Sequence, residues 1–363
     1  MSIFGAYVSN YFDDFVALAA SAEVESVAQS VTLAFKLLGW IFAETGEKAP
    51  PFSISAPALG VVLDVSLLRS GSVTIDNTPN RKLEIRNAIT RILEEGKLGK
   101  QDALKLRGRL QFMSGQIFGR VSKKCLAVIT SHAYSDFGPV LSTESKHALA
   151  LFLKLISMDV PREVSLSKLA TWFLFTDACY EPDDPARKAG VGAVLVNNRG
   201  VQYGFFSHFL DDSFLERMNV AKRRTIIFEC ELLAIFLAML CWKQELTGAQ
   251  VVCCTDNDGV KDCLISCQTS SSNSVPILHS ILQMEFDMKW NSWFSRVPTE
   301  SNIADPPSRG KISELLAHGV HQYKLDLEAA WSEMLELARG EAETSTSNPV
   351  LENNYSAKAA AEI

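Results

Sequence analysis

Features that mark membrane and secreted proteins are missing from this sequence. The longest apolar run, residues 232–242, has eleven residues, whereas a membrane-spanning helix needs about 20. The N-terminus has no basic segment ahead of an apolar one, and Asp13 and Asp14 interrupt its apolar pattern. We therefore expect no contact with a membrane, no secretion, and a location in the cytoplasm or the nucleus.

Disulfide and zinc-binding patterns are also lacking. The eight cysteines lie between residues 125 and 267 of a 363-residue chain, several of them inside apolar runs, which is typical of reduced thiols. Cys263 and Cys267 form a CxxxC pair with only His279 nearby, and the two CxxC pairs of a structural zinc site are missing. A zinc site is therefore disfavoured.

Positive charge is scarce overall but concentrated in one segment. The chain has 35 Lys and Arg against 42 Asp and Glu, a net charge of −7. This total argues against a general polyanion-binding protein, because neutralising phosphates requires Lys and Arg. However, twelve basic and only four acidic residues lie between residues 81 and 124, so this segment carries +8 and the rest −15.

The hydrophobic pattern divides the chain into segments of different character. At 363 residues and 47% apolar composition, it can bury two or three cores. Residues 1–77 show an α/β pattern, with a hairpin-like stretch at 11–18, a helix at 23–38 and a strand at 59–65. The pattern of residues 78–165 is helical. Residues 311–340 are expected to form a C-terminal helix, and residues 341–363, rich in Glu, Ser, Asn and Ala, a disordered tail.

Strand patterns dominate residues 166–310. The expected strands lie at 172–177, 191–196, 201–207, 249–255 and 290–297, and the expected helices at 225–244, from 258, and at 275–288. Three consecutive strands, a helix, a strand, helices and a last strand predict an α/β fold with a mixed five-stranded sheet and flanking helices.

Four acidic residues of this segment occupy positions suited to metal chemistry. Asp177 and Asp256 end predicted strands, Glu231 lies on the long helix, and Asp305 lies at the start of a helix. Clustered carboxylates are unfavourable unless cations occupy the site. Two Mg²⁺ ions about 4 Å apart would hold both the attacking and the leaving oxygen of a phosphodiester. Taken singly, each Asp can equally be a turn residue or a helix N-cap.

The sequences around these residues resemble a known family. FTDA (175–178), ECELLAIFLA (229–238), TDNDGV (255–260) and ESNIADPPSR (300–309) are similar to the four catalytic blocks of retroelement RNase H domains. The resemblance covers residues 170–310. It implies that Asp177, Glu231, Asp256 and Asp305 bind two Mg²⁺ or Mn²⁺ ions and cleave the RNA strand of RNA·DNA hybrids.

Acidic residues within these four blocks, and a missing His, lead to three further expectations. Glu229 and Glu231 lie about 200° apart on a helix, so only one can face the sheet, and Glu231 is preferred because it shares its face with small alanines. Asp258 is expected to cap the next helix. The His that many RNase H enzymes carry shortly before the last Asp is missing, so either Glu300 substitutes or turnover is reduced.

The chain as a whole resembles the C-terminal part of a retroelement reverse transcriptase, of the LTR or DIRS-like type, in which residues 1–77 are similar to a partial palm with the strand near the primer grip. Tyr11-Phe12-Asp13-Asp14 is similar to the YxDD hairpin, which implies metal ligands at Asp13 and Asp14, and the basic helical segment is similar to the thumb and connection. The implied nucleic-acid contacts are Lys97, Lys100, Lys105, Arg107, Arg109, Lys222, Arg223 and Arg224. Only ten residues precede the motif, so the fingers and the first catalytic Asp are expected to be missing and this chain alone should not polymerise DNA.

Three functions remain open at this point. The first is a metal-dependent nuclease module that binds RNA·DNA hybrids through the basic helices. The second is a relic or domesticated fragment that binds nucleic acid without cutting it. The third is a polymerase subunit completed by a separate N-terminal polymerase portion. The sequence makes no prediction of the oligomeric state.

Overall fold

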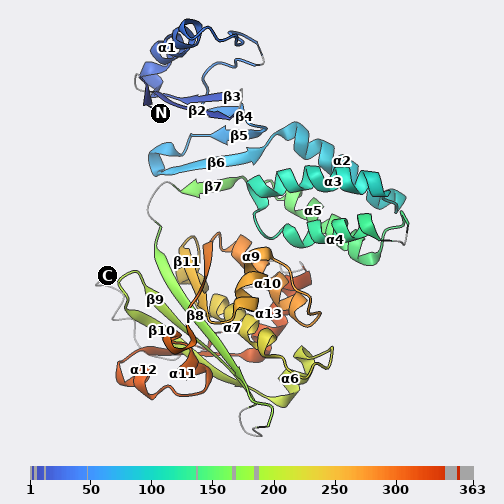
Figure 1. Cartoon of the computed structure of the whole chain (residues 1–363), viewed down its shortest axis with the longest axis vertical. Coiled ribbons are helices and arrows are strands. Elements are labelled where there is room, and N and C mark those ends of the chain that lie inside the picture. Colours follow the sequence, from blue (N-terminus) through green and yellow to red (C-terminus); the bar gives the residue numbers. More distant parts are fainter. Residues whose placement is uncertain are drawn as a thin grey trace. The chain divides into compact units, whose positions relative to one another are not determined.

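The computed structural model describes residues 2–3, 6–11, 14–46, 48–135, 138–165, 169–183, 188–339 and 350–351. These fall into two compact units. Unit 1 comprises residues 1–97, 108–117 and 153–167, and unit 2 comprises residues 98–107, 118–152 and 168–363. Each unit is considered separately below (Figure 1).

Unit 2 is built on a seven-stranded mixed sheet in the order β12-β11-β8-β9-β10-β13-β14. β8 is antiparallel to β9 and parallel to β11, and β9 is antiparallel to β10. The strand bounds are β8 Thr171–Tyr180, β9 Ala189–Asn197, β10 Gln202–Leu210, β11 Gln250–Thr255, β12 Asn291–Arg296, β13 His321–Leu325 and β14 Val350–Leu351. The five strands expected from the sequence are all present and form one continuous block of this sheet, with the element order that the sequence pattern predicted.

The expectation of five strands was wrong, because the C-terminal region adds two more. Residues 311–340, expected to be helical, contain α12 (Ser313–Ala317), β13 and α13 (Leu327–Arg339). β13 runs parallel to β10, and β14 pairs with β13 inside the segment expected to be a disordered tail. The five-residue run His321–Leu325 is too short for a periodicity that separates a strand from a helix.

Helix α7 (Ile227–Cys241) is the centre of the core of unit 2. All its residues from Glu229 to Cys241 are buried, as expected for a helix that is apolar around its whole circumference. It packs on β8 and β9, and α10 (Ser274–Asp287) packs on α7 and α13. The remaining helices on this body are α6 (Asp212–Met218), α8 (Lys243–Leu246), α9 (Asp258–Ser266) and α11 (Asp305–Ser308), with the 3₁₀ turn η4 (Thr299–Ser301).

Alternation along the strands assigns the two faces of this sheet. Ala193 and Leu195 of β9 belong to the cluster around α7, whereas Val194 and Val196 pack with Leu315 of α12. Successive strand residues point to opposite faces, so α7 covers one face of the sheet and α12 the other. Figure 1 shows α11 and α12 next to each other, beside β9 and β10.

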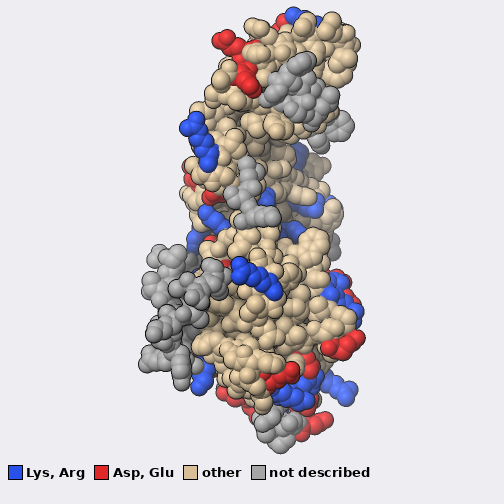
Figure 2. Space-filling model, turned by 90° about the vertical axis from the view of Figure 1, so that its left-hand side faces the viewer, with Lys and Arg blue, Asp and Glu red and all other residues tan. Residues whose placement is uncertain are grey.

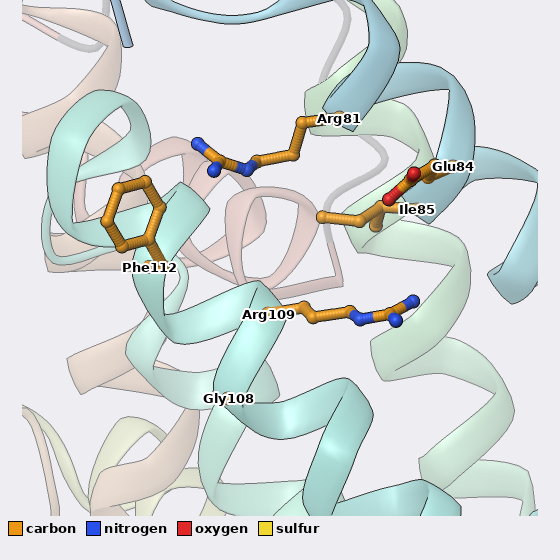
Figure 3. A pocket seen from close by; sticks show the side chains of 6 residues that line it. All are labelled: Arg81, Glu84, Ile85, Gly108, Arg109 and Phe112. Carbon is orange, nitrogen blue, oxygen red and sulfur yellow. The ribbon is translucent and has the colours of Figure 1, made fainter. Parts of the chain in front are cut away.

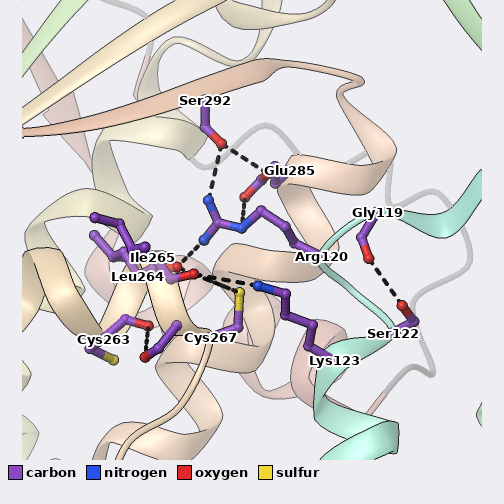
Figure 4. A network of polar contacts seen from close by, with 11 residues as sticks. Gly119, Arg120, Ser122, Lys123, Cys263, Leu264, Ile265, Cys267, Glu285 and Ser292 are labelled. Carbon is purple, nitrogen blue, oxygen red and sulfur yellow. Dashed lines mark hydrogen bonds and ion pairs between the residues drawn. The ribbon is translucent and has the colours of Figure 1, made fainter. Parts of the chain in front are cut away.

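Arg120 connects a helical segment of unit 2 to the part of the unit that contains the seven-stranded sheet. Its guanidinium lies 3.5 Å from Glu285 Oε2 of α10, donates a 3.1 Å hydrogen bond to Ser292 Oγ of β12, and also bonds the carbonyl of Leu264 (Figure 4). The guanidinium also lies over the ring of Phe294, 4.6 Å from its centre. These contacts hold the start of α4 (Lys123–Tyr134) against α9, α10 and β12.

Unit 1 contains two small antiparallel sheets. The first, β1-β2-β3, consists of β1 Ser2–Ile3, β2 Ala6–Tyr11 and β3 Asp14–Leu18, followed by η1 (Ser21–Glu23) and α1 (Val24–Leu37). The second, β4-β5-β6-β7, consists of β4 Ser55–Ala58, β5 Val61–Asp64, β6 Ser72–Asn77 and β7 Arg162–Ser165, with η2 at Leu68–Ser70. The hairpin and helix expected at the N-terminus are present.

The helices expected after residue 78 are also present. They are α2 (Pro79–Glu95), α3 (Lys100–Met113), which continues into a π-helical turn at Ser114–Phe118, α4, and α5 (Thr143–Ser157). Pro79 occupies the first helical position of α2 and Gly96, with φ of 64°, ends it, the usual placing of these two residues. No helix among the described residues is long and apolar enough to span a membrane.

Candidate functional site

Asp177 lies in β8, between β9 and β11, and is 5% exposed. Phe173 and Phe175, on the same side of the strand, pack in the cluster that contains Leu315. Asp177 therefore belongs to the sheet face that α12 covers. Its partner across the ladder to β9 is Gly192.

Two glycines of β9 allow the backbone of α11 to pack directly against this strand. A Cβ atom at Gly190 would lie 2.1 Å from the carbonyl oxygen of Ser308, and one at Gly192 would lie 2.4 Å from the backbone nitrogen of Ser308. Any side chain at either position would therefore displace α11. The Ser207 hydroxyl of β10 donates a 2.6 Å hydrogen bond to the Pro307 carbonyl and secures the same helix.

This close contact brings residues of α11 to Asp177. Ser308 Oγ donates a 2.5 Å hydrogen bond to Asp177 Oδ2. Asp305, half-buried at the start of α11, accepts a 3.0 Å hydrogen bond from Arg309 Nε, and Arg309 also binds Glu181. Asn302 donates to the Thr176 carbonyl at 3.1 Å and accepts from the Ala304 nitrogen, which holds the preceding turn on β8.

The two glutamates at the start of α7 point to different places. Glu231, 7% exposed, accepts hydrogen bonds from Thr255 Oγ1 at 3.1 Å and Asn257 Nδ2 at 3.0 Å, at the end of β11. Glu229, 1% exposed, accepts from the hydroxyl of Ser271, in the linker before α10, and from that of Ser274, the first residue of α10. Glu231 is therefore the one that lies beside the strand ends.

Asn257 connects this site to helix α9. Its Oδ1 accepts from the backbone nitrogens of Gly259 and Val260 and caps the helix, while its Nδ2 binds Glu231. The expectation that Asp258 would be the cap was wrong, because Asp258 instead pairs with Lys261 and Arg296. An amide can cap and donate at once, which a carboxylate cannot.

The carboxylates of the site repel one another. Burial, followed by the charges of Asp256 and Asp305, raises the pKa of Asp177 to about 7, although the Ser308 hydrogen bond and Arg309 oppose this. Burial, followed by the charges of Asp177 and Asp256, raises the pKa of Glu231 to about 7, opposed by Asn257 and Thr255. The four predicted carboxylates thus form one electrostatic group, in which Asp256 and Asp305 are the more exposed members.

The donor chemistry of this group suits a hard divalent cation, since every candidate ligand is a carboxylate oxygen. A cation would also relieve the repulsion that raises both pKa values. As positioned here, however, no three Asp, Glu, His or Cys side chains among the described residues enclose a metal position. Asp305 is engaged by Arg309 instead. All eight cysteines are buried, free thiols.

The basic segment is less available to a ligand than its composition implies. Four of its twelve cations are buried or already engaged by groups of the protein itself: Arg81 by Gly60 and Phe112, Lys82 by Asp76 and Asp159, Arg120 by Glu285, and Lys124 by burial. Of the predicted contact residues, Lys97, Lys100, Lys105 and Arg109 are exposed and Arg107 is half-buried. Lys97 and Arg109 belong to unit 1, and Lys100, Lys105 and Arg107 to unit 2. On the face drawn in Figure 2, basic and acidic side chains are interspersed.

The second predicted basic group, Lys222, Arg223 and Arg224, lies in the loop between α6 and α7 and is exposed. Its backbone is fixed by two asparagines. Asn219 both accepts from the Arg223 nitrogen and donates to the Arg223 carbonyl, and the buried Asn273 accepts from the Ala221 nitrogen. The backbone of Lys222 has a positive φ of 48°, in the left-handed region. Within the described residues these three cations form no ion pair.

Of the YxDD motif, the structure describes only the flanks. Tyr11 of β2 pairs with Asp14 of β3 across the hairpin, while Phe12 and Asp13 lie outside the described residues. The predicted metal-binding role of Asp13 and Asp14 therefore stays a prediction. Glu300 is exposed in η4, so its suggested substitution for the missing His likewise stays open.

The sequence reasoning did not single out Ser308, Arg309, Asn257 and Gly192. The segments ESNIADPPSR and TDNDGV already contain Ser308, Arg309 and Asn257. The sequence therefore placed these residues next to the candidate carboxylates, but it did not predict which side chains they contact. Gly192 stands in the alternating Gly190-Val191-Gly192 pattern of a predicted strand. Glycine inside a strand is a known sign that another backbone approaches closely.

No protein-family model and no curated protein matches this sequence. RNase H1 from Halobacterium salinarum NRC-1 is similar in structure at 16% identity, covering 40% of this chain and 98% of that one, with a TM-score of 0.29. LC11-RNase H1, isolated from compost and solved with an RNA/DNA hybrid, gives 16% identity, 40% and 99% coverage and a TM-score of 0.32.

A longer stretch of the chain is similar to the foamy viral protease-reverse transcriptase, solved with double-stranded DNA. The identity is 13%, the coverage 79% of this chain and 46% of that one, and the TM-score 0.35. The chain thus spans under half the length of that protein. At these TM-scores the likenesses carry no functional argument, which has to come from the residues of the site.

Proposed function

We propose that unit 2 is an RNase H-like nuclease that hydrolyses the RNA strand of RNA·DNA hybrids. The observation that supports this proposal is the mutual repulsion of carboxylates from separate elements, since the charges of Asp256 and Asp305 act on Asp177 and those of Asp177 and Asp256 act on Glu231. Two of them have pKa values raised to about 7 by burial and mutual repulsion. Repelling, buried carboxylates in one place are typical of a functional site.

These four residues would hold two Mg²⁺ or Mn²⁺ ions, which when bound activate a water molecule and stabilise the leaving 3′-oxyanion. Ser308 keeps Asp177 in place, and Thr255 with Asn257 keeps Glu231 in place. Asp305 would have to exchange Arg309 for the cation. Lys222, Arg223 and Arg224 would bind phosphates without reading the base sequence.

The test exploits the two buried glutamates of one helix. Glu231→Gln is expected to abolish cleavage of a labelled RNA·DNA hybrid in Mg²⁺, because an amide replaces a metal-binding carboxylate. Glu229→Gln should retain cleavage, because an amide oxygen can still accept from Ser271 and Ser274. Equal cleavage by both variants, or an intact hybrid with the unmodified chain, would refute the proposal.

A second candidate is nucleic-acid binding without cleavage, and the Arg309–Asp305 ion pair favours it. If Asp305 remains bound to Arg309, the carboxylate set stays incomplete. The melting temperature in Mg²⁺ or Mn²⁺ separates the two functions. A nuclease should be stabilised by these ions, by about 2.7 kcal/mol at a hundred times the dissociation constant, and Asp177→Asn should lose this stabilisation. A non-catalytic chain should bind the hybrid with no such effect.

A further inference from the structure

A second candidate site lies in unit 1, between α2 and α3. A pocket of about 370 Å³ is lined by Arg81, Glu84, Ile85, Gly108, Arg109 and Phe112 (Figure 3). Its volume lies at the lower end of the roughly 300–1,000 Å³ of small-ligand sites. That size suits a single nucleotide better than a whole duplex.

The aromatic wall of this pocket is built and held in place. The Arg81 guanidinium lies over the Phe112 ring, 4.3 Å from its centre, and it also bonds the carbonyl of Gly60 in the β4–β5 turn. Phe112 nevertheless remains 41% exposed. A guanidinium plane that lies over a fixed phenyl ring forms a layered surface on which an unpaired base can stack.

The polar groups of the pocket favour an anionic ligand with a hydrogen-bond donor. Arg109 and Glu84 are exposed, and neither forms an ion pair among the described residues. With Arg81, the pocket carries two guanidiniums against one carboxylate, so it attracts negative charge. Arginine binds phosphate through paired N–H donors, and a carboxylate accepts from the exocyclic amino group of cytosine.

The floor of the pocket is open because Gly108 has no side chain. A Cβ atom there would meet nothing within 4 Å. A side chain at this position can therefore extend into the pocket without disturbing the helix. This offers a way to fill the pocket and leave every charge in place.

We infer that this pocket binds one unpaired nucleotide of a single strand whose base carries an exocyclic amino group, as cytosine does. The base stacks on the layered pair of Arg81 and Phe112, its amino group donates to Glu84, and its phosphate is bound by Arg109. In a duplex both faces of a base are covered by its neighbours, so only a single strand can offer the base in this way. The inference concerns unit 1 and does not depend on cleavage by unit 2.

Binding of fluorescein-labelled dC5 and dT5 to the full chain, followed by fluorescence anisotropy, tests this inference. dC5 is expected to bind more tightly than dT5, because thymine lacks an exocyclic amino group. Gly108→Met, which fills the pocket, and Phe112→Leu should each weaken dC5 binding by about five- to 150-fold, the range of base stacking. Arg109→Gln should lower the slope of log affinity against log salt by about 0.7.

Matched variants make the outcome decisive. Arg91→Gln removes an exposed cation of α2 that pairs with Glu95, and it should leave the preference for dC5 unchanged. Glu84→Gln should narrow the difference between dC5 and dT5. Unchanged dC5 affinity in Gly108→Met and Arg109→Gln, neither of which removes a buried contact, would overturn the inference. Equal binding of dC5 and dT5 by the unmodified chain would overturn it as well. Both probes are DNA, so neither result bears on RNA cleavage.

Discussion

The hydroxyl of Ser308 donates a 2.5 Å hydrogen bond to Oδ2 of Asp177 and joins α11 to the central strand β8. This bond favours the ionised form of Asp177, so Ser308→Ala is expected to raise its pKa further. The Mg²⁺ concentration needed for half-maximal hybrid cleavage should rise about 10- to 100-fold, the usual effect of removing a group that holds a metal ligand.

Ser207→Ala is the matched control for this prediction. The Ser207 hydroxyl also fixes α11, through the Pro307 carbonyl, but it does not touch a carboxylate. It is expected to lower the melting temperature without changing the Mg²⁺ requirement. A Mg²⁺ titration of cleavage that shifts equally in both variants would mean that Ser308 acts only through the attachment of α11.

Gly192→Ala is expected to displace α11 from the sheet. The new methyl group would lie 2.4 Å from the Ser308 nitrogen, closer than any van der Waals contact allows. Overpacking of this kind destabilises by about 1–3 kcal/mol, and here it would also move Ser308 and Asp305. Thermal unfolding should show the loss of stability, and cleavage should be lost at temperatures where the variant is still folded.

Gly108→Ala provides the contrast, since nothing lies within 4 Å of a Cβ atom at that position. Gly108 is inside α3, so alanine should stabilise the chain by about 0.5–1 kcal/mol. A similar effect of both substitutions on unfolding would contradict the close packing of α11 against β9.

The fixed loop that carries Lys222, Arg223 and Arg224 is expected to dominate the salt dependence of hybrid binding. Neutralising each phosphate contact changes the slope of log affinity against log salt by about 0.9 on a duplex. The triple Gln variant should therefore lower that slope by about 2 to 3. Arg199→Gln, in the exposed β9–β10 turn, should change it little, and an unchanged slope in the triple variant would exclude the loop from the interface.

His279 of α10 is expected to make unit 2 sensitive to acid. Burial, followed by the charge of Lys124, lowers its pKa from 6.5 to about 4. The unfolded chain therefore binds a proton at His279 between pH 6.5 and 4 while the folded chain does not. Stability is fully present above pH 6.5 and falls with decreasing pH through this window, by about 1.4 kcal/mol per pH unit at most.

Melting temperatures measured from pH 4 to 8 can isolate this effect. The difference between the unmodified chain and His279→Gln should be constant above pH 7 and change steadily below pH 6.5. A constant difference for His279→Gln throughout would show that the folded chain protonates this residue as readily as the unfolded one.

The sequence predicted the elements of the sheet in unit 2 well, because each carries a strong local signal. β11 is a short apolar run before Asp256, and α7 is a long one bounded by polar residues. β13 and β14 were missed, because they join the sheet only through pairing with β10 and with each other. Such long-range pairing leaves no trace in the pattern of a five- or two-residue segment.

The sequence predicted four carboxylates as the candidate site, and it predicted none of the side chains that contact them. Helical geometry showed that only one of Glu229 and Glu231 can face the sheet, and the small alanines on the same helix face as Glu231 favoured that residue. The roles of Asn257 and Ser308 depend on where α9 and α11 lie in space, and Asp258 looked like a better cap than it is. The charge count of residues 81–124 overstated the number of cations that are free to bind a ligand. Some of these cations form ion pairs with Asp76, Asp159 and Glu285.

Arg120 also determines where this protein can be divided. Its ion pair partner Glu285 has a side chain only 11% exposed, and a carboxylate so deeply buried needs a counter-charge. A fragment that begins at residue 166 would retain every carboxylate of the candidate site and lose Arg120. We expect such a fragment to be less stable than the same body expressed with residues 98–152, and Glu285→Leu to restore part of the difference. We therefore expect the autonomous part of this chain to be larger than the segment that carries the four candidate carboxylates.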